Sequence, residues 1–363
     1  MNPERPKRDE TNYYSQDKNA VIGLLRTILA LAVIYFHSFV LTGKVDPLYI
    51  YGTDTGKIAV QLFFFLSGFL LIRKAIDLPF DEFMFRRIKR IFPGLFVFLL
   101  TCCILMIFLS ILGIFHVATR DVFSWFYTNI DPINPNRMYT VNGVFSLNPV
   151  PQSVAGNLWT VTFEFWCYLF LAGGLSILKR LKFLKGRDQS LSLIMVSLVM
   201  YLHIFGTIRL GDEINVGSLD YFVYVLLPIF LFGCVCQIQL NKLRRFGQVI
   251  RVIFVASAIF AVYLIFHLEK YDEIGPYVLG TLLVFLVEIK RVPKIRIINY
   301  FKSHDIAFGV YLYSYPIQQL FWFLGARSNF VNFLLASTVS IILGHISYAK
   351  IESPWLRKND PIK

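Results

Sequence analysis

Charged residues are scarce in this sequence. Asp, Glu, Lys and Arg make up only 16% of its 363 residues, whereas soluble domains carry roughly 25%. Hydrophobic residues reach 56%, and a disordered chain would instead combine low hydrophobicity with high net charge. A coiled coil also needs charged residues beside its apolar seam. The composition therefore excludes a disordered chain, a coiled coil and an ordinary soluble domain.

Cysteine is also scarce, and the five cysteines all fall inside apolar runs (Cys102, Cys103, Cys167, Cys234 and Cys236). This placement excludes a disulfide scaffold and a zinc site. No spacing of His, Cys and carboxylates is typical of a metal site, and no glycine-rich phosphate loop is present. We therefore predict neither a metal nor a permanently bound cofactor. The first 19 residues are polar, so no cleavable signal peptide is expected.

Apolar and aromatic residues dominate what remains. The chain has 36 Phe and 19 Tyr and a mean hydropathy of +0.58. Because a membrane-spanning helix needs about 20 mostly apolar residues, we predict an all-α, polytopic membrane helix bundle that folds as one unit. This length criterion predicts ten spans, at 20–42, 57–77, 93–116, 158–178, 189–207, 221–240, 249–268, 275–290, 304–323 and 329–350.

The basic residues behind the net charge of +13 are distributed unevenly among the loops between the predicted spans. Of the 36 Lys and Arg residues, 28 lie in the two ends and alternate loops, 7 lie in the other loops, and Arg26 lies inside a span. Because basic residues accumulate in cytoplasmic loops, both ends (1–19 and 351–363) are expected in the cytoplasm. Residues 20–350 would form the membrane domain, with 117–157 as a long outer loop that covers the bundle or binds an acceptor. We reject nucleic-acid binding, because the cytoplasmic loops account for most of the positive charge.

Arg26 and His37 are ionisable residues inside the first span, and such residues are functional candidates by default. Their separation of 11 residues corresponds to roughly 20° around a helix with about 100° per residue. Along the helix axis it corresponds to about 16 Å. The two side chains therefore share a face, which predicts one polar channel. Alternatives are snorkelling of Arg26 towards cytoplasmic phosphates and a helix–helix hydrogen bond for His37.

Glu164 is the third ionisable residue inside a span, and its predicted depth resembles that of His37. A carboxylate beside His37 would orient the imidazole and stabilise its protonated form. The alternative is a structural ion pair. Trp159 lies near the outer interface, where tryptophan is ordinary.

A basic cluster, Arg86, Arg87, Lys89 and Arg90, comes just before Pro93, which suits the start of the third span. Arg87 and Arg90 are spaced i, i+3 and so project from one side, where guanidinium groups suit phosphates. Anchoring at the cytoplasmic face is the alternative.

Two apolar segments carry small or polar residues. LFFFLSGFLL contains Ser67 and Gly68, which typically permit close helix packing; a nucleophilic Ser67 has no base specified beside it. GVYLYSYPIQQ contains Tyr315, Pro316 and Gln318 and is typical of a proline-distorted helix that lines a cavity.

Together these segments resemble the acyltransferase 3 family of integral-membrane acyltransferases over nearly the whole chain. The resemblance rests on Arg26 and His37 with ten residues between them, FFFLSGFLL, Arg87–Arg90 with the following proline, LWTVTFEF with Glu164, and GVYLYSYPIQQ. Many members have histidine before the Tyr/Trp-Pro of the last motif, where this chain has Ser314.

The resemblance implies transfer of an acetyl group from acetyl-CoA, as co-substrate, to a hydroxyl of a surface polysaccharide or lipid-linked glycan. It also implies a bacterial inner-membrane location. Arg26, His37 and Glu164 would be catalytic, with His37 as general base or covalent acyl carrier. Arg86, Arg87 and Arg90 would bind acyl-CoA, and Trp159, Tyr315 and Gln318 the acceptor. The rival classes are a transporter or flippase for a lipid-linked glycan and a structural subunit of a polysaccharide assembly complex.

Overall fold

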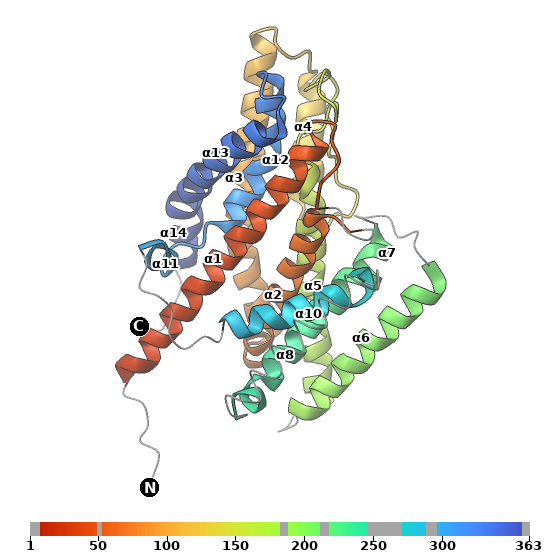
Figure 1. Ribbon diagram of the computed structural model, residues 1–363, viewed down its shortest axis with the longest axis vertical. Helices are drawn as coiled ribbons and strands as arrows, with labels where there is room; N and C mark the ends of the chain where they lie inside the picture. Colours follow the sequence, from red (N-terminus) through yellow and green to blue (C-terminus); the bar gives the residue numbers. More distant parts are fainter. Residues whose placement is uncertain are drawn as a thin grey trace.

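The computed structural model describes residues 8–48, 53–181, 188–210, 218–245, 271–287 and 296–357. Within these ranges the chain is all helical and contains no strand (Figure 1). The main helices are α1 (Arg8–Val40), α2 (Thr55–Asp77), α3 (Phe80–Ile111), α4 (Thr119–Ile130), α5 (Trp159–Arg180), α6 (Asp188–Leu210), α8 (Leu227–Arg245), α10 (Tyr271–Val287), α11 (Arg296–Phe301), α12 (Ala307–Phe323) and α13 (Asn329–Ser347). Shorter helical turns are η1 (Gly156–Leu158), α7 (Leu219–Tyr221), η2 (Phe222–Leu226), η3 (Tyr348–Glu352) and α14 (Ser353–Arg357).

Among the described residues, six helical stretches are long and apolar enough to cross a membrane: Lys18–Val40, Thr55–Asp77, Phe80–Ile111, Gly156–Arg180, Leu219–Leu240 and Asn329–Leu356. Ser190–Gly206 and Gly275–Val284 are shorter apolar helices. The prediction of an all-helical, multi-pass membrane protein is therefore supported. The expected span 249–268 lies outside the described residues, so the count of ten spans and the cytoplasmic location of both ends stay predictions.

The helix α2 lies against α8 with almost no space between their backbones. A Cβ on Gly68 of α2 would lie 1.9 Å from the carbonyl oxygen of Phe230 on α8. A Cβ on Gly233 of α8 would lie 2.1 Å from the carbonyl oxygen of Phe65. Such contacts are far below van der Waals distance, so only glycine fits at either position. The prediction that the small residues of this segment permit close packing is confirmed for Gly68.

The helix α3 begins earlier than the sequence analysis predicts. It starts at Phe80 and contains Pro93 in its interior, so the expectation that Pro93 opens the helix is wrong. Asp81 and Glu82 occupy the first turn, where acidic residues favour the helix dipole. Arg86 reaches back one turn to Glu82, with 2.7 Å between the guanidinium nitrogen and the carboxylate oxygen. These local interactions extend the helix through a segment too polar to be recognised as part of a span.

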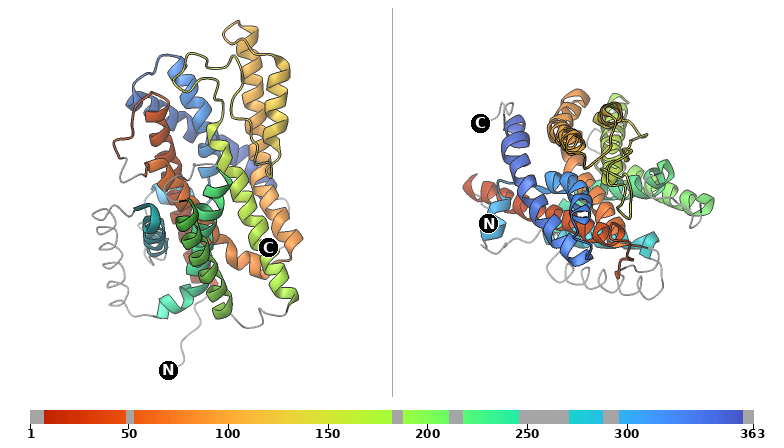
Figure 2. Two further views of the ribbon diagram at one scale, coloured as in Figure 1. Left: turned by 90° about the vertical axis from the view of Figure 1, so that its right-hand side faces the viewer. Right: turned by 90° about the horizontal axis from the view of Figure 1, so that it is seen from above.

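The outer segment, residues 117–157, is packed onto the bundle. It contains α4, which runs beside α3 (Figure 2), and Trp125 of α4 is completely buried. Arg137 donates hydrogen bonds to the carbonyl oxygen of Asn129 at 2.7 Å and to Oγ1 of Thr162 on α5 at 2.5 Å. Burial lowers the pKa of Arg137 to about 10. The outer segment is therefore an ordered cover over one end of the bundle, which we call the outer end.

Candidate active site

A cavity of about 530 Å³ lies towards the opposite end of the bundle from the outer segment. We call it the basic cavity. It is lined by six cationic side chains (Lys18, Arg26, Lys74, Arg87, Arg90 and Lys302) but only two carboxylates (Glu164 and Asp305). This imbalance favours an anionic ligand.

Two carboxylates hold two of the arginines in place. Asp305, in the connection between α11 and α12, lies 2.5 Å from Arg26 and 2.8 Å from Arg90, measured from its Oδ2 to the guanidinium nitrogens. A second nitrogen of Arg90 lies 2.8 Å from Oε2 of Glu352 in η3. Glu352 is completely buried and also accepts a hydrogen bond from Ser347. These ion pairs join α1, α3, η3 and the connection between α11 and α12 at one end of the bundle.

Arg87 differs from its two neighbours in the cavity. Among the described residues it forms no ion pair with a carboxylate, and its buried Nε has no hydrogen-bond partner. Its guanidinium carbon lies 5.7 Å from the centroid of the Phe83 ring. Arg87 and Arg90 both line the basic cavity, as their i, i+3 spacing requires. Because no carboxylate of the described residues pairs with it directly, Arg87 is the best-placed contact for an anion.

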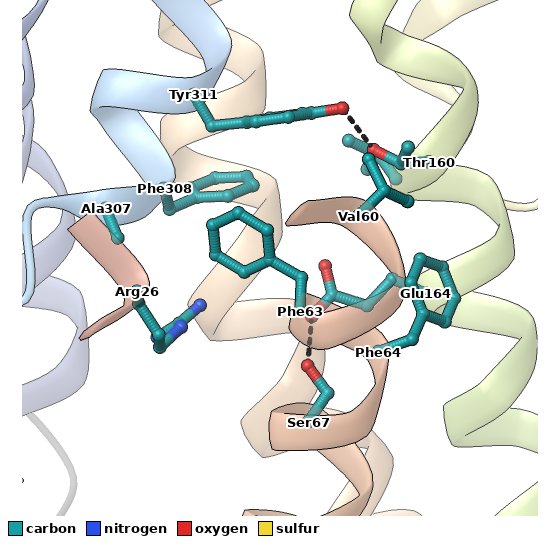
Figure 3. A pocket seen from close by; sticks show the side chains of 11 residues that line it. Arg26, Val60, Phe63, Phe64, Ser67, Thr160, Glu164, Ala307, Phe308 and Tyr311 are labelled. Atoms are coloured by element: carbon teal, nitrogen blue, oxygen red, sulfur yellow. Dashed lines mark hydrogen bonds between the residues drawn. The ribbon is translucent and has the colours of Figure 1, made fainter. Parts of the chain in front are cut away.

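Glu164 lies between the basic cavity and a second, smaller one. Its Oε1 accepts hydrogen bonds from the hydroxyl of Ser67, at 3.2 Å, and from the hydroxyl of Tyr168. A cavity of about 40 Å³, the small cavity, continues from this point. Arg26, Ser67, Glu164 and Phe308 line both cavities, so the two are adjacent. Figure 3 shows Arg26 and Glu164 extending into this region from different helices.

His37 lies further towards the outer end, against α12. Its ring contacts that of Tyr315 edge to face, with 5.1 Å between the centroids and an interplanar angle of 85°. The Tyr315 hydroxyl is 2.9 Å from the Ser153 hydroxyl of the outer segment. Nδ1 of His37 is buried and has no hydrogen-bond partner among the described residues. The imidazole therefore has a ring nitrogen that could form a hydrogen bond with a substrate.

The structure separates the predicted site residues into groups. Arg26, Arg87, Arg90 and Glu164 border the basic cavity, whereas Tyr315 contacts His37. The expected contact between Glu164 and His37 is replaced by the hydrogen bonds of Glu164 to Ser67 and Tyr168.

The other three predicted residues lie apart from both cavities. Gln318 donates to the carbonyl oxygen of Ile34, one turn before His37 on α1. Trp159 packs on Phe163 and Tyr221. Arg86 is half-exposed and does not line the basic cavity.

Three residues of the basic cavity and its ion pairs were not singled out by the sequence analysis: Asp305, Glu352 and Tyr168. Asp305 and Glu352 each lie at the predicted cytoplasmic end of a span, among many basic residues. An isolated carboxylate in a strongly basic, juxtamembrane segment is the signal that could have found them. Tyr168 lies four residues after Glu164, and so on the same helix face.

Comparison with known proteins identifies the family of this chain. Residues 19–349 match the family model of an acyltransferase domain. The chain belongs to the acyltransferase 3 family. An O-acetyl transferase of Shigella phage Sf6 is 25% identical over 359 residues, which cover 93% of this chain and 96% of the relative. A relative named "Putative acetyltransferase ORF330", from Acidianus two-tailed virus, is 25% identical over 314 residues, or 84% of each chain. No solved structure matches the chain.

Membership of the acyltransferase 3 family makes this chain an acyltransferase with membrane helices. Of the family-like motif residues, Arg26, Arg87, Arg90 and Glu164 surround one basic cavity, and His37 lies beyond it on the outer side. Among the described residues, no group of three or more His, Cys, Asp or Glu side chains could hold a metal ion.

Proposed function

We propose that this chain transfers an acetyl group from cytoplasmic acetyl-CoA to a hydroxyl group of a glycan at the far side of a bacterial inner membrane. The observation that carries the proposal is the basic cavity, where Arg87 has no carboxylate partner among the described residues. Its volume of about 530 Å³ lies within the 300–1,000 Å³ typical of small-molecule sites. CoA, with its diphosphate and 3′-phosphate, is the anionic donor that such a cavity suits.

In this proposal, Arg87 makes the main contact to a CoA phosphate. Arg90 is held by Asp305 and Glu352, so its charge is compensated and its role is to fix the structure of the cavity beside that phosphate. Arg86 is half-exposed and paired with Glu82, which leaves it only a long-range attraction for the donor. The acyl end of CoA would extend along Arg26 towards the small cavity.

His37 is proposed as the general base for the acceptor hydroxyl. The hydroxyl oxygen attacks the thioester carbonyl carbon, a C–O bond forms and the C–S bond breaks. The hydroxyl proton passes to His37 and then to the CoA sulfur, so CoA leaves as the free thiol. An acyl group carried on His37 itself is the other route. Tyr315 would keep the imidazole in place, while Gln318 and Trp159 would contribute to the acceptor site.

Glu164 is proposed to act on the donor side of the reaction. Its hydrogen bonds to Ser67 and Tyr168 fix the carboxylate where both cavities meet. It also interacts electrostatically with Arg87. In this role Glu164 helps to hold Arg87 in place and leaves His37 to the acceptor.

The test is acetyl transfer by the purified protein in lipid vesicles. Labelled acetyl-CoA and a chemically de-O-acetylated bacterial polysaccharide are the substrates, and release of free CoA is measured alongside labelling of the glycan. His37→Ala is expected to lose at least about 100-fold in rate, which is the low end for general-base catalysis. His116→Ala, at an exposed histidine just before the outer segment, is the matched control.

Two results would contradict this proposal. Wild-type turnover by a folded His37→Ala protein would remove the histidine from the chemistry. Movement of a lipid-linked glycan across the membrane without CoA release would instead support the transporter class.

A further inference from the structure

A single tyrosine side chain connects His37 to the outer segment. The ring of Tyr315 on α12 contacts the imidazole edge to face, with 5.1 Å between the centroids, which is a preferred geometry for aromatic pairs. The hydroxyl of the same side chain lies 2.9 Å from the hydroxyl of Ser153 in the outer segment. Tyr315 and Ser153 are each 5% exposed, so solvent scarcely competes for this hydrogen bond. A shift of the Tyr315 ring would therefore change the surface against which the imidazole packs.

Gly156, the first residue of η1, leaves the space that the Tyr315 ring occupies. A Cβ on Gly156 would lie 2.8 Å from Cζ of Tyr315 and 3.0 Å from its hydroxyl oxygen. These distances are shorter than van der Waals contact, so a side chain at this position would displace the ring. Ser153 and Gly156 thus act on one aromatic ring, the first through a hydrogen bond and the second through close contact.

We propose that Ser153 and Gly156 are positioning residues, which hold the imidazole of His37 in its reactive orientation through the ring of Tyr315. This inference rests on the proposed function, because it takes His37 as the general base. Neither Ser153 nor Gly156 touches a substrate in this role. The outer segment would then contribute to catalysis in addition to covering the end of the bundle.

The outer segment is attached to α12 on both sides of this contact. One turn after Tyr315, the side chain of Gln319 donates a hydrogen bond to the carbonyl oxygen of Ser153 at 2.9 Å. One turn before Tyr315, the carbonyl oxygen of Tyr311 accepts a hydrogen bond from the side chain of Asn157 at 2.5 Å. Tyr311, Tyr315 and Gln319 are four residues apart and so lie along one face of α12. The outer segment is therefore fixed along this face, and the Ser153 hydroxyl has a defined position beside the ring.

The helix that carries His37 is attached to α12 as well. Gln318, which is completely buried, donates a hydrogen bond to the carbonyl oxygen of Ile34 at 2.8 Å, and Ile34 lies one turn before His37 on α1. These contacts fix the backbones and leave the orientation of the imidazole to its own surroundings. Nδ1 of His37 has no hydrogen-bond partner among the described residues. Packing against Tyr315 therefore orients the ring where a hydrogen bond at Nδ1 does not.

The experiment measures kcat and KM of the purified protein in lipid vesicles, with acetyl-CoA and the de-O-acetylated polysaccharide as substrates. Ser153→Ala and Tyr315→Phe should each lower kcat several-fold, because the ring loses the hydrogen bond that holds it. Gly156→Ala should lower kcat about 10–100-fold, since a displacement of about 1 Å in a catalytic site can cost about 100-fold. The KM for each substrate should stay at its wild-type value, because equal losses in kcat and kcat/KM indicate an interaction that acts in the transition state.

The double variant Ser153→Ala/Tyr315→Phe separates positioning from general damage to the fold. It should lower kcat no further than the stronger single variant, because both substitutions remove the same hydrogen bond. Ser176→Ala and Gly173→Ala on α5 are the matched controls. The Ser176 hydroxyl donates to the carbonyl oxygen of Ala172 at 2.7 Å, and no atom lies within 4 Å of a methyl group added at Gly173. Both controls should keep the wild-type kcat.

Three results would overturn the positioning role and leave the proposed function standing. The first is a wild-type kcat in folded Ser153→Ala and Gly156→Ala proteins. The second is a loss in the double variant equal to the product of the two single losses, which would mean that Ser153 and Tyr315 act separately. The third is a raised KM for the polysaccharide at unchanged kcat, which would make Tyr315 a direct acceptor contact. Wild-type turnover by a folded His37→Ala protein would overturn the proposed function, and the positioning role with it.

Discussion

At the scale of single residues, Arg87 and Arg90 have different roles in the basic cavity. Arg90 is 15% exposed in its side chain and pairs with both Asp305 and Glu352, whereas Arg87 is not paired with a carboxylate among the described residues. Removing one member of a buried ion pair leaves an uncompensated charge. The two arginines should therefore respond differently to the same substitution.

Arg90→Ala is expected to destabilise the protein by about 3–5 kcal/mol, the usual cost of breaking a buried pair. Arg87→Ala should leave the thermal unfolding midpoint almost unchanged and weaken CoA binding at least about 10-fold, since a charge-assisted hydrogen bond contributes roughly 1.5–3 kcal/mol. Thermal unfolding in detergent and binding of labelled CoA measure the two effects. The double variant Arg90→Ala/Glu352→Gln should recover part of the lost stability. Equal destabilisation by both single variants would contradict this division of roles.

The residues that could be predicted from the sequence are those whose geometry is local. Arg87 and Arg90 are three positions apart on one helix, so their shared direction follows from helix periodicity alone. The partners of Arg90 are separated from it by 215 and 262 residues. No periodicity connects positions so distant, and only the folded bundle brings Asp305 and Glu352 to Arg90.

At the scale of helices, α2 carries two features with separate tests, the first of which is its N-terminus. Asp54 is the N-cap of α2, and its side chain accepts a hydrogen bond from the backbone N–H of Lys57 at 2.7 Å. Burial raises the pKa of this carboxyl group in spite of that hydrogen bond. Folding therefore disfavours the ionised form, and this cost is present at neutral pH and disappears as the pH falls through the raised pKa.

Asp54→Asn keeps the cap, because Asn and Asp are equally good N-cap residues, and removes the charge. We expect it to match or exceed wild-type stability at pH 7, with any advantage disappearing on acidification. Asp54→Ala should cost about 1 kcal/mol at low pH, where only the cap differs. Unfolding midpoints measured for the three proteins from pH 4 to pH 8 test this. An advantage of Asp54→Asn that grows as the pH falls would show that the sign is wrong.

The second feature of α2 is its contact with α8. Gly68→Ala would place a methyl group 1.9 Å from the carbonyl oxygen of Phe230, so the helices must separate and the folded protein should be strongly destabilised. Gly173→Ala, in the middle of α5 with no atom within 4 Å of the added group, is the control and should be neutral or slightly stabilising. Yield and unfolding midpoint of the detergent-purified variants distinguish them. A Gly68→Ala protein as stable as Gly173→Ala would mean that α2 and α8 are further apart.

Helices were predictable where an apolar run alone defines them. The apolar runs behind α2, α5 and α13 all appear as helices near their expected positions. The first turns of α3 were missed because residues 80–92 are rich in charge, and their helical structure depends on side-chain pairs rather than on hydropathy. The polar anchors of the outer segment, such as Asn148 bound to Gln319, depend on contacts between distant parts of the chain and have no local signature.

At the scale of the whole molecule, the proposed reaction requires the basic cavity and the outer segment to face opposite sides of the membrane. The structure holds them at opposite ends of one bundle, joined by α1, whose Arg26 lies in the basic cavity and whose His37 contacts Tyr315. The order of Arg26 and His37 along α1 was predictable from residue count. The depth of Glu164 was not, because it depends on how α5 packs against α1 and α2: Glu164 was expected level with His37 and instead borders the donor side.

Sidedness can be measured with single introduced cysteines, because all five native cysteines are buried. Leu147 of the outer segment is 81% exposed, and Asp81 at the start of α3 is also exposed. A membrane-impermeant maleimide should label Leu147→Cys in intact cells. It should label Asp81→Cys only after the membrane is opened, because 28 of the 36 basic residues lie on the side predicted to be cytoplasmic. The native protein is the control for labelling of buried cysteines. The reverse pattern would put the basic cavity outside, where cytoplasmic acetyl-CoA cannot reach it. Labelling of both positions in intact cells would put the start of α3 and the outer segment on the same side.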